Sequence, residues 1–291
     1  MGHIIVHAIM SIRHLLTLSS TLVLVAIAAG GRAAEMPPRI VSLSPHITEL
    51  LFAAGAGPAI VGVDDSSDYP AAVAAIPRVG EPSALDIEGL LKLKPTLIVL
   101  WDSGTPERRK AELERLKLKL LVTEQRHLDD IPSTLIEFGH LAASEGVAAA
   151  AARSYQIELQ RLRAQYAARA RLKVFYQVWD RPLYTLSGEH VVSEILSLCG
   201  GENVFGELAT LAPGIDKEAV LARAPDVILI AAPAADTVRQ VRDWNRFPGI
   251  PAVSRHHVFG VDPTLLGRMG PRILQGVQQV CSLLDRARER T

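Results

Sequence analysis

Short aliphatic runs alternate along the chain with segments whose apolar residues recur every three or four positions. The first such segment places Ile47, Leu50, Leu51 and Ala54 on one helical face, and Gly55 follows as a C-terminal cap. Strands that alternate with helices favour a mostly parallel sheet with helices on both faces. The aliphatic runs that predict strands in the first half are at 39–44, 59–63, 96–101 and 119–123.

The second half repeats this plan from residue 172 onward. Ser193-Glu194 falls 145 positions after Thr48-Glu49 (193 minus 48), and Gly200 falls at the same offset from Gly55. A helix-to-strand motif also occurs twice: "EGLLKLKPTLIVL" begins at Glu88 and "EAVLARAPDVILI" at Glu218, 130 residues later (218 minus 88). Duplicated sheets can be merely architectural. Several pairs in the same order nevertheless favour two similar lobes.

A segment without Gly or Pro from Val147 to Arg171 separates the two patterns. Its apolar residues Tyr155, Leu159, Leu162 and Tyr166 form one stripe on an Ala- and Arg-rich helix. We therefore expect an α/β protein of two lobes, each a mostly parallel sheet flanked by helices, joined by one long rigid α-helix about 35 Å in length. The expected boundaries are 37–144, 145–171 and 172–291.

The first residues are typical of a secretory signal. Arg13 precedes an apolar run that ends in small residues, and Gly31 and Ala33 suit the positions three and one before a cleavage site. We expect residues 1–33 to be removed and the mature protein to be in a Gram-negative periplasm, whether translation starts at Met1 or Met10. The alternative is an uncleaved anchor, but the run is shorter than the roughly 20 residues that span a bilayer.

Composition and charge exclude some classes of partner. The 291 residues include 31 basic and 31 acidic side chains, so no basic field is available to attract nucleic acid. Two cysteines in an oxidising compartment predict a Cys199–Cys281 disulfide. A zinc site is the weaker alternative, because two isolated cysteines provide half a ligand set.

Candidate binding residues follow the predicted strands, where open α/β sheets bind ligands. Trp101 ends a buried strand, and aromatic side chains at such ends suit a bulky, flat ligand between two lobes. A core or rim position is the ordinary alternative for any one Trp. The other residues at strand ends are Ser44, Pro45, His46, the run 64–67, Trp179, Asp180, Arg181, Tyr184 and Asp262.

Catalytic and metal sites are less well supported. Ser42, Ser44 and His46 are close in sequence, but no nucleophile elbow surrounds the serines, and Thr48 fits a helix start with a capping role. Adjacent His256 and His257 point to opposite sides, so surface positions are favoured over metal ligation. His46 is interpreted as a residue of the loop entering the helix, with axial ligation of a bound metal macrocycle as the alternative.

These features resemble the helical-backbone (class III) substrate-binding proteins of ABC importers, and within them the periplasmic cobalamin-binding (corrinoid-binding) branch. The likeness covers nearly all of the mature chain. It is carried by "RIVSLSPHITELLFAAG", "IVGVDDSSDYP", "IEGLLKLKPTLIVLW", "LCGGENVF", "EAVLARAPDVILI" and "GPRIL".

The resemblance implies capture of a corrinoid between the lobes and delivery to an inner-membrane permease of two identical subunits, without catalysis and without a cofactor. A monomer is expected. Haem- or siderophore-binding proteins of the same fold are the nearest alternative, and a metal-ion-binding relative or a periplasmic hydrolase is less favoured. Where the best-known member of that family places aromatics that embrace the corrin, this chain has Ser66, Pro82 and Ala212. The implied ligand-facing residues are Ser44, Pro45, His46, Ser66, Pro82, Trp101, Trp179, Tyr184, Asp262 and Arg268.

The resemblance also gives a role to the acid at the head of each repeated motif. In the family, glutamates at these positions dock onto arginines of the permease, one per subunit. Glu88 and Glu218 are therefore expected to be exposed and to make no essential ligand contact. A structural alternative is sufficient for either acid alone, because Glu in a first helical turn is stabilised by the helix dipole.

Overall fold

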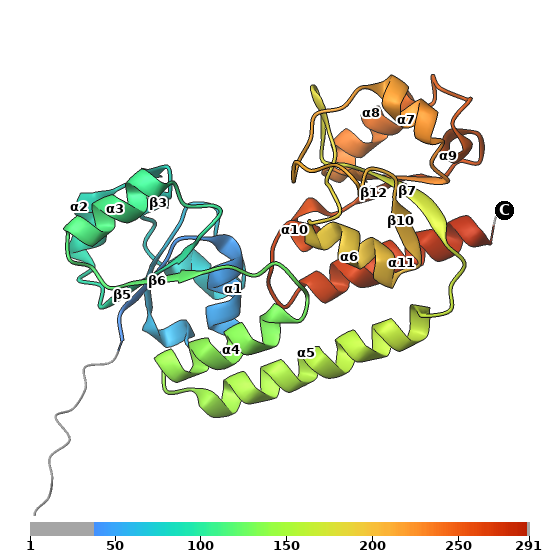
Figure 1. Cartoon of the computed structure of the whole chain (residues 1–291). Coiled ribbons are helices and arrows are strands. Elements are labelled where there is room, and N and C mark those ends of the chain that lie inside the picture. The colour runs from blue at the N-terminus through green and yellow to red at the C-terminus, as the bar shows by residue number, and fades with distance from the viewer. Residues whose placement is uncertain (1–37, 290–291) are drawn as a thin grey trace, which may run out of the picture. The chain divides into compact units, whose positions relative to one another are not determined.

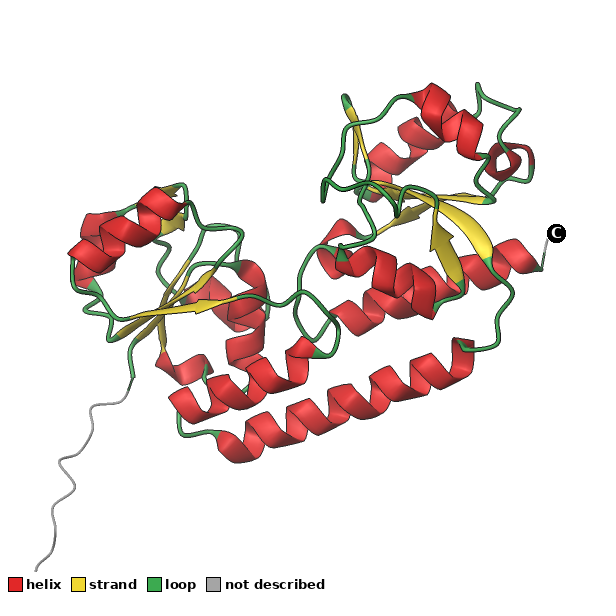
Figure 2. Ribbon diagram, in the orientation of Figure 1, coloured by secondary structure: helices red, strands yellow, loops and turns green. Residues whose placement is uncertain are grey.

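The structure, a computed structural model, describes residues 38–289, in which helices and strands alternate (Figures 1 and 2). The signal segment expected at 1–33 lies outside the described residues. Within residues 38–289, no helix is both long and apolar enough to cross a membrane.

Four parallel strands form the sheet of the first half, in the order β2-β1-β5-β6. A two-stranded antiparallel ribbon, β3-β4, accompanies it. The elements are β1 (Ile40–Ser42), α1 (Pro45–Ala53), η1 (Gly57–Ala59), β2 (Ile60–Val63), η2 (Ala71–Ala75), β3 (Gly80–Glu81), β4 (Ala84–Leu85), α2 (Ile87–Lys92), β5 (Leu97–Trp101), α3 (Glu107–Arg115), β6 (Leu120–Thr123) and α4 (Asp130–Leu141).

The sheet of the second half is also parallel, in the order β10-β7-β11-β12. Counted along the chain, both sheets have the order 2-1-3-4, so the repeat in the sequence is a repeat in topology. The elements are β7 (Leu172–Gln177), β8 (Trp179–Asp180), β9 (Leu183–Tyr184), α6 (Val191–Leu198), β10 (Gly201–Asn203), α7 (Lys217–Arg223), β11 (Val227–Ala231), α8 (Ala234–Trp244), α9 (Pro251–Ser254), β12 (Val258–Val261), α10 (Pro263–Leu266) and α11 (Ile273–Arg288).

Each sheet is buried on both faces because its strands carry apolar residues at successive positions. Along β5, Leu97 and Val99 face one hydrophobic cluster and Ile98 and Leu100 face another. Along β11, Val227 and Leu229 belong to the first of these clusters, and Ile228 and Ile230 to a third. The predicted fold class of parallel sheets flanked by helices is therefore confirmed.

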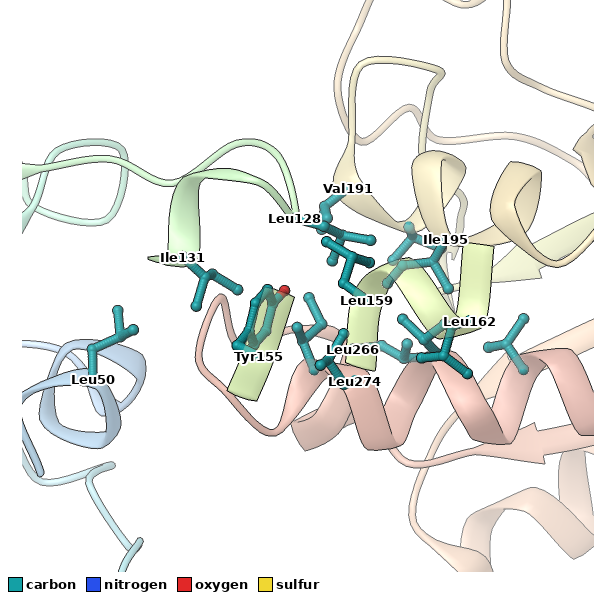
Figure 3. Packing of buried hydrophobic residues seen from close by; sticks show 14 of the residues in the cluster. Leu50, Leu128, Ile131, Tyr155, Leu159, Leu162, Val191, Ile195, Leu266 and Leu274 are labelled. Atoms are coloured by element: carbon teal, nitrogen blue, oxygen red, sulfur yellow. The ribbon is translucent and has the colours of Figure 1, made fainter. Parts of the chain in front are cut away.

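The helix between the halves, α5, runs over Glu145–Tyr166, and so it ends five residues before the expected Arg171. Residues 167–171 form a turn and the approach to β7 instead. The predicted stripe of Tyr155, Leu159, Leu162 and Tyr166 is buried throughout. Figure 3 shows part of this packing, in which α5 side chains lie with those of α1, α4, α6, α10 and α11. One hydrophobic cluster thus includes residues of both halves.

The backbone conformation at the ends of equivalent helices is also the same in the two halves. Gly55 and Gly200, which follow α1 and α6, both have a positive φ, of 85° and 74°. Lys94 and Ala224, which follow α2 and α7 and precede a proline, also have positive φ, of 47° and 50°. A left-handed residue ends a helix sharply, and Pro cannot continue it. Each motif therefore leads from helix to strand by the same turn.

The predicted disulfide between Cys199 and Cys281 is confirmed, with the two Cα atoms 4.7 Å apart. It joins the end of α6 to the middle of α11, and both cysteines are fully buried. Because it closes a loop of 82 residues, it stabilises the fold by roughly 4 kcal/mol in the chain-entropy model.

Candidate functional site

His46 and Trp101 lie together where β1 and β5 end. Their rings make an edge-to-face contact with centroids 5.2 Å apart. His46 is 5% exposed and its Nδ1 lies 2.7 Å from the Ser44 hydroxyl, whereas Trp101 is half-buried. Burial, with a smaller contribution from the positive charge of Arg268, lowers the pKa of His46 to about 4, so the imidazole is neutral at physiological pH.

A buried network of hydroxyl groups holds the start of α1, which carries His46. Thr48 Oγ1 lies 2.8 Å from the hydroxyls of both Ser42 and Ser67, and Ser67 donates to the carboxylate of Asp64. Burial raises the pKa of Asp64 to about 6, although the Ser67 hydrogen bond acts in the opposite direction. The predicted capping role of Thr48 is wrong, because Ser44 is the N-cap of α1 and Thr48 joins this network.

A pocket of about 240 Å³ has Trp101 in its lining. This volume is smaller than the roughly 300–1,000 Å³ of typical small-molecule sites. The pocket therefore suits one edge of a larger ligand. Its lining combines apolar and polar side chains from both halves of the chain: Trp101, Ser103, Glu124, Gln125, Arg126, His127, Glu189, His190, Val191, Leu211, Leu266, Gly267 and Met269.

Most of these lining residues escaped the sequence interpretation. Gln125 and His127 come from the loop after β6, His190 is the N-cap of α6, and Leu211 and Met269 belong to connections in the second half. One signal was available: β6 is the strand beside β5, so the loop after it had to lie near Trp101. The residues that come from the second half have no comparable local signal.

Arg268, one of the expected ligand residues, lies beside Ser66, which is another. Its guanidinium donates to the carboxylates of Asp68 and Glu49 and lies 3.4 Å from the Ser66 carbonyl oxygen. The Ser66 hydroxyl donates to Glu81 at 2.5 Å. Arg268 is therefore engaged by carboxylates. Pro82 is half-buried at the turn of the β3-β4 ribbon, where its carbonyl accepts from Arg109.

Trp179 and Tyr184 are directly opposite each other on the β8-β9 ribbon. They are 62% and 36% exposed, and neither belongs to the lining of the Trp101 pocket. Asp262 is also outside that lining: its carboxylate caps α10 by accepting from the Thr264 backbone at 2.8 Å. The structure thus brings Trp101 together with His46 at the start of α1, and places Trp179, Tyr184 and Asp262 outside the lining of this pocket.

Glu88 and Glu218 occupy equivalent places in the first turns of α2 and α7. Both are exposed. In each helix the capping role belongs to an aspartate two residues earlier, since Asp86 accepts from the Gly89 N–H and Asp216 from the Ala219 N–H. The glutamates are therefore not needed as caps.

No group of three or more His, Cys, Asp and Glu side chains within residues 38–289 is arranged to hold a metal ion. His256 is exposed, but the surface position expected for His257 is wrong. That ring is 1% exposed and stacks on Phe259 at 6.2 Å, with Nδ1 3.2 Å from the Asp226 carbonyl oxygen.

Comparison with known proteins places the chain in a family. Residues 40–265 match the family model described as periplasmic binding protein. A vitamin B12-binding protein of Vibrio cholerae is 36% identical over 251 residues, which cover 86% of this chain and 90% of that protein. The crystal structure of the periplasmic vitamin B12-binding protein BtuF of Vibrio cholerae matches with a TM-score of 0.80 and 36% identity, covering 87% of this chain and 98% of that one.

A more distant match, the periplasmic haem-binding protein HutB of Vibrio cholerae, has 23% identity and a TM-score of 0.74, and covers 85% of this chain and 98% of that one. At that identity it shows the shared fold alone. The two parallel sheets, the helix α5 and the pocket beside Trp101 define a two-lobed binding protein. The chain belongs to the periplasmic binding protein family, and like its relatives it is a binding protein of a transport system and not an enzyme.

Proposed function

We propose that this chain captures a corrinoid such as cobalamin and delivers it to an ABC permease of the inner membrane. The observation that carries the proposal is the 36% identity to a vitamin B12-binding protein over nine tenths of that protein's length. The half-buried Trp101 beside a pocket supports it, because a flat macrocycle gains affinity by stacking on an aromatic face.

In this proposal Trp101 and the start of α1, with Ser44, Pro45 and His46, receive one side of the ligand. The exposed Trp179 and Tyr184 offer the largest aromatic surface in the second half and are proposed to contact another side. Ser66, Pro82, Asp262 and Arg268 complete the proposed set. Of these, Arg268 would contact ligand only in exchange for part of its pairing with Asp68.

Haem or a siderophore is the second candidate ligand, because haem-binding proteins share the fold. Calorimetric titration of the purified mature protein with cobalamin separates the candidates. We expect saturable one-to-one binding, weakened by roughly 1–3 kcal/mol in Trp101→Ala, since an aromatic in a binding pocket contributes about that much. Absence of cobalamin binding by the wild-type protein would refute the proposed function.

For delivery, we propose that Glu88 and Glu218 dock onto arginines of a permease with two equivalent subunits. Each glutamate is followed one turn later by an exposed leucine. These leucines are Leu91 and Leu221, which are 43% and 44% exposed. An exposed acid with an exposed Leu beside it suits a partner that offers an arginine and an apolar contact, twice. Charge-assisted pairs with Arg are strong and directional.

Reversal of both charges tests the docking. Glu88→Lys with Glu218→Lys should abolish association with the permease and uptake, while corrinoid affinity stays within a few-fold of wild type. Glu107→Lys with Glu145→Lys is a matched control, because these acids also lie in exposed first helical turns and change the net charge equally. Normal delivery of the ligand by the Glu88→Lys, Glu218→Lys variant would show that the two glutamates serve only as residues of the first helical turn.

We also propose that residues 1–33 are a cleaved signal and that the mature chain is a periplasmic monomer. The support is the pattern of Arg13, the apolar run, Gly31 and Ala33, together with the periplasmic family. N-terminal sequencing of the protein secreted by a Gram-negative host should give Ala34 as the first residue. Retention of the first 33 residues in the membrane fraction would contradict this.

A further inference from the structure

Gln125 is a buried amide in the lining of the Trp101 pocket. It follows β6, is 4% exposed, and shares the lining with apolar side chains such as Leu266 and Met269. A buried amide normally has partners for both its carbonyl oxygen and its NH₂ group, because either group loses its hydration on burial.

The orientation of this amide is determined by its neighbours. The Thr134 hydroxyl donates to the Asp130 carbonyl oxygen at 3.0 Å, so its single hydrogen is committed and it can only accept from Gln125. The group that faces Thr134 must therefore be the NH₂ of Gln125, which lies 3.3 Å from Thr134 Oγ1 and 2.5 Å from Thr123 Oγ1. The carbonyl oxygen of Gln125 is therefore the atom of the amide that is not bonded to either threonine.

That carbonyl oxygen, Oε1, is buried, and no donor within residues 38–289 bonds to it. An unsatisfied acceptor destabilises the folded protein, whereas a donor supplied by a ligand would recover the lost free energy. Gln240 provides a contrast within the same chain. It is also buried, but its Oε1 accepts from Gln177 Nε2.

We propose that Gln125 Oε1 accepts a hydrogen bond from a primary carboxamide N–H on the edge of the bound solute, and so selects amide-bearing ligands against their carboxylates. This inference rests on the proposed function and deepens it. The corrin ring carries acetamide and propionamide side chains, which donate N–H groups. Haem carries propionates, which at neutral pH have no hydrogen to donate and would place a negative charge beside a carbonyl dipole.

Cyanocobalamin and its monocarboxylic acids, each with one side-chain amide replaced by an acid, provide the test. Wild-type protein should bind one of the acids about tenfold more weakly than the parent amide, the loss expected for one buried hydrogen bond. Gln125→Met should weaken binding of the parent about tenfold and should bind that acid and the parent almost equally. Gln240→Met is the matched control and should leave both affinities unchanged.

Equal binding of every monoacid and the parent by wild type would overturn the inference, and this arm needs no variant to fold. Affinity of folded Gln125→Met within twofold of wild type for cobalamin would overturn it too, and would indicate a structural amide. Tighter binding of a monoacid than of the parent amide by wild type would also overturn the inference, and would indicate that Arg126 in the same lining directs the preference. Failure of wild type to bind any corrinoid is a different result, since it refutes the proposed function itself.

Discussion

At the scale of single residues, His46 shows how environment sets chemistry. Sequence pattern places it correctly after the first strand, but the position expected for it in the loop before the helix is wrong, because His46 is the second residue of α1. It is buried beside Trp101, and its Nδ1 is matched to the Ser44 hydroxyl. Its folded-state pKa is about 4, whereas an unfolded histidine titrates near 6.5. The neutral ring is therefore favoured by the fold.

Replacement of His46 by Gln should change how stability depends on pH. Between pH 6.5 and 4 the unfolded wild-type chain binds a proton that the folded protein does not, so this group lowers stability as pH falls, by about 1.4 kcal/mol per pH unit. From pH 7.5 to 5.0, the stability of wild type relative to His46→Gln should fall by about 2 kcal/mol. Urea unfolding at both pH values measures it.

Asp64 acts in the opposite sense but does not affect this comparison. Its raised pKa means that the folded protein keeps a proton up to about pH 6, so its contribution to stability falls as pH rises from 3.8 to 6. Both proteins contain Asp64, and its contribution cancels in the difference. Parallel pH profiles for wild type and His46→Gln would contradict the assignment of a neutral, buried His46.

Residue-level prediction from strand ends placed Trp101 at a pocket, but it did not identify the residues that share this pocket. Trp101 could be placed at a pocket because a buried aliphatic run ends on it. Gln125 and His190 could not, because their shared pocket arises from the meeting of two loops 65 residues apart (190 minus 125). Periodicity reports which face of an element is buried, but it does not report which loops meet.

At the scale of elements, the repeated helix-turn-strand motif is the most informative feature. The sequence offset of 130 residues matches Lys94 to Ala224, and both have left-handed backbone conformations. Left-handed conformation costs a non-glycine residue about 1–2 kcal/mol. That two non-glycine residues adopt it at equivalent places indicates that the sharp turn is imposed by the strand that follows.

Ala224→Gly should therefore stabilise the protein. Relief of the left-handed conformation exceeds the extra chain entropy of Gly by about 0.5–1 kcal/mol. Ala222→Gly, two residues earlier in the helical part of α7, is the control and should destabilise by about 1 kcal/mol. Thermal or urea unfolding decides between them, and destabilisation by both substitutions would show that the turn is not left-handed.

The elements that were missed have weak local patterns. The ribbons β3-β4 and β8-β9 consist of two-residue strands, which are too short for an alternating pattern. Helix α4 contains Pro132 in its first turn, which weakens its local helical pattern. The long helix α5 was predictable because its apolar residues recur at the helical period, and the strands β5 and β11 were predictable because each is a continuous apolar run.

At the scale of the whole molecule, two glutamates on equivalent helices each bind groups that lie outside their own half. Glu49 of α1 is 3% exposed, and its two carboxylate oxygens pair with Arg272 at 2.5 and 2.9 Å. Glu194 of α6 accepts from the Leu128 backbone and pairs with Arg163, both at 3.2 Å. These pairs and the shared hydrophobic cluster connect the two halves in both directions.

Glu49→Gln should be strongly destabilising. The substitution leaves Arg272 paired with a neutral side chain that is buried. The expected loss in free energy of unfolding is about 2–4 kcal/mol. This is less than for a fully buried pair, because Arg272 is partly hydrated. Glu194→Gln is the matched control. Its side chain is 27% exposed, so we expect a loss of about 1 kcal/mol. Similar losses for both would contradict the larger role of Glu49.

The most direct measurement is a competition between the two candidate ligands. Mature protein is mixed with equal amounts of cobalamin and haem, each in excess, and the absorption spectrum of the protein-bound fraction is recorded after gel filtration. We expect one corrinoid per protein molecule and no haem, because the pocket beside Trp101 provides an aromatic face and a buried amide acceptor. A haem spectrum without corrinoid in the bound fraction would contradict the proposed function.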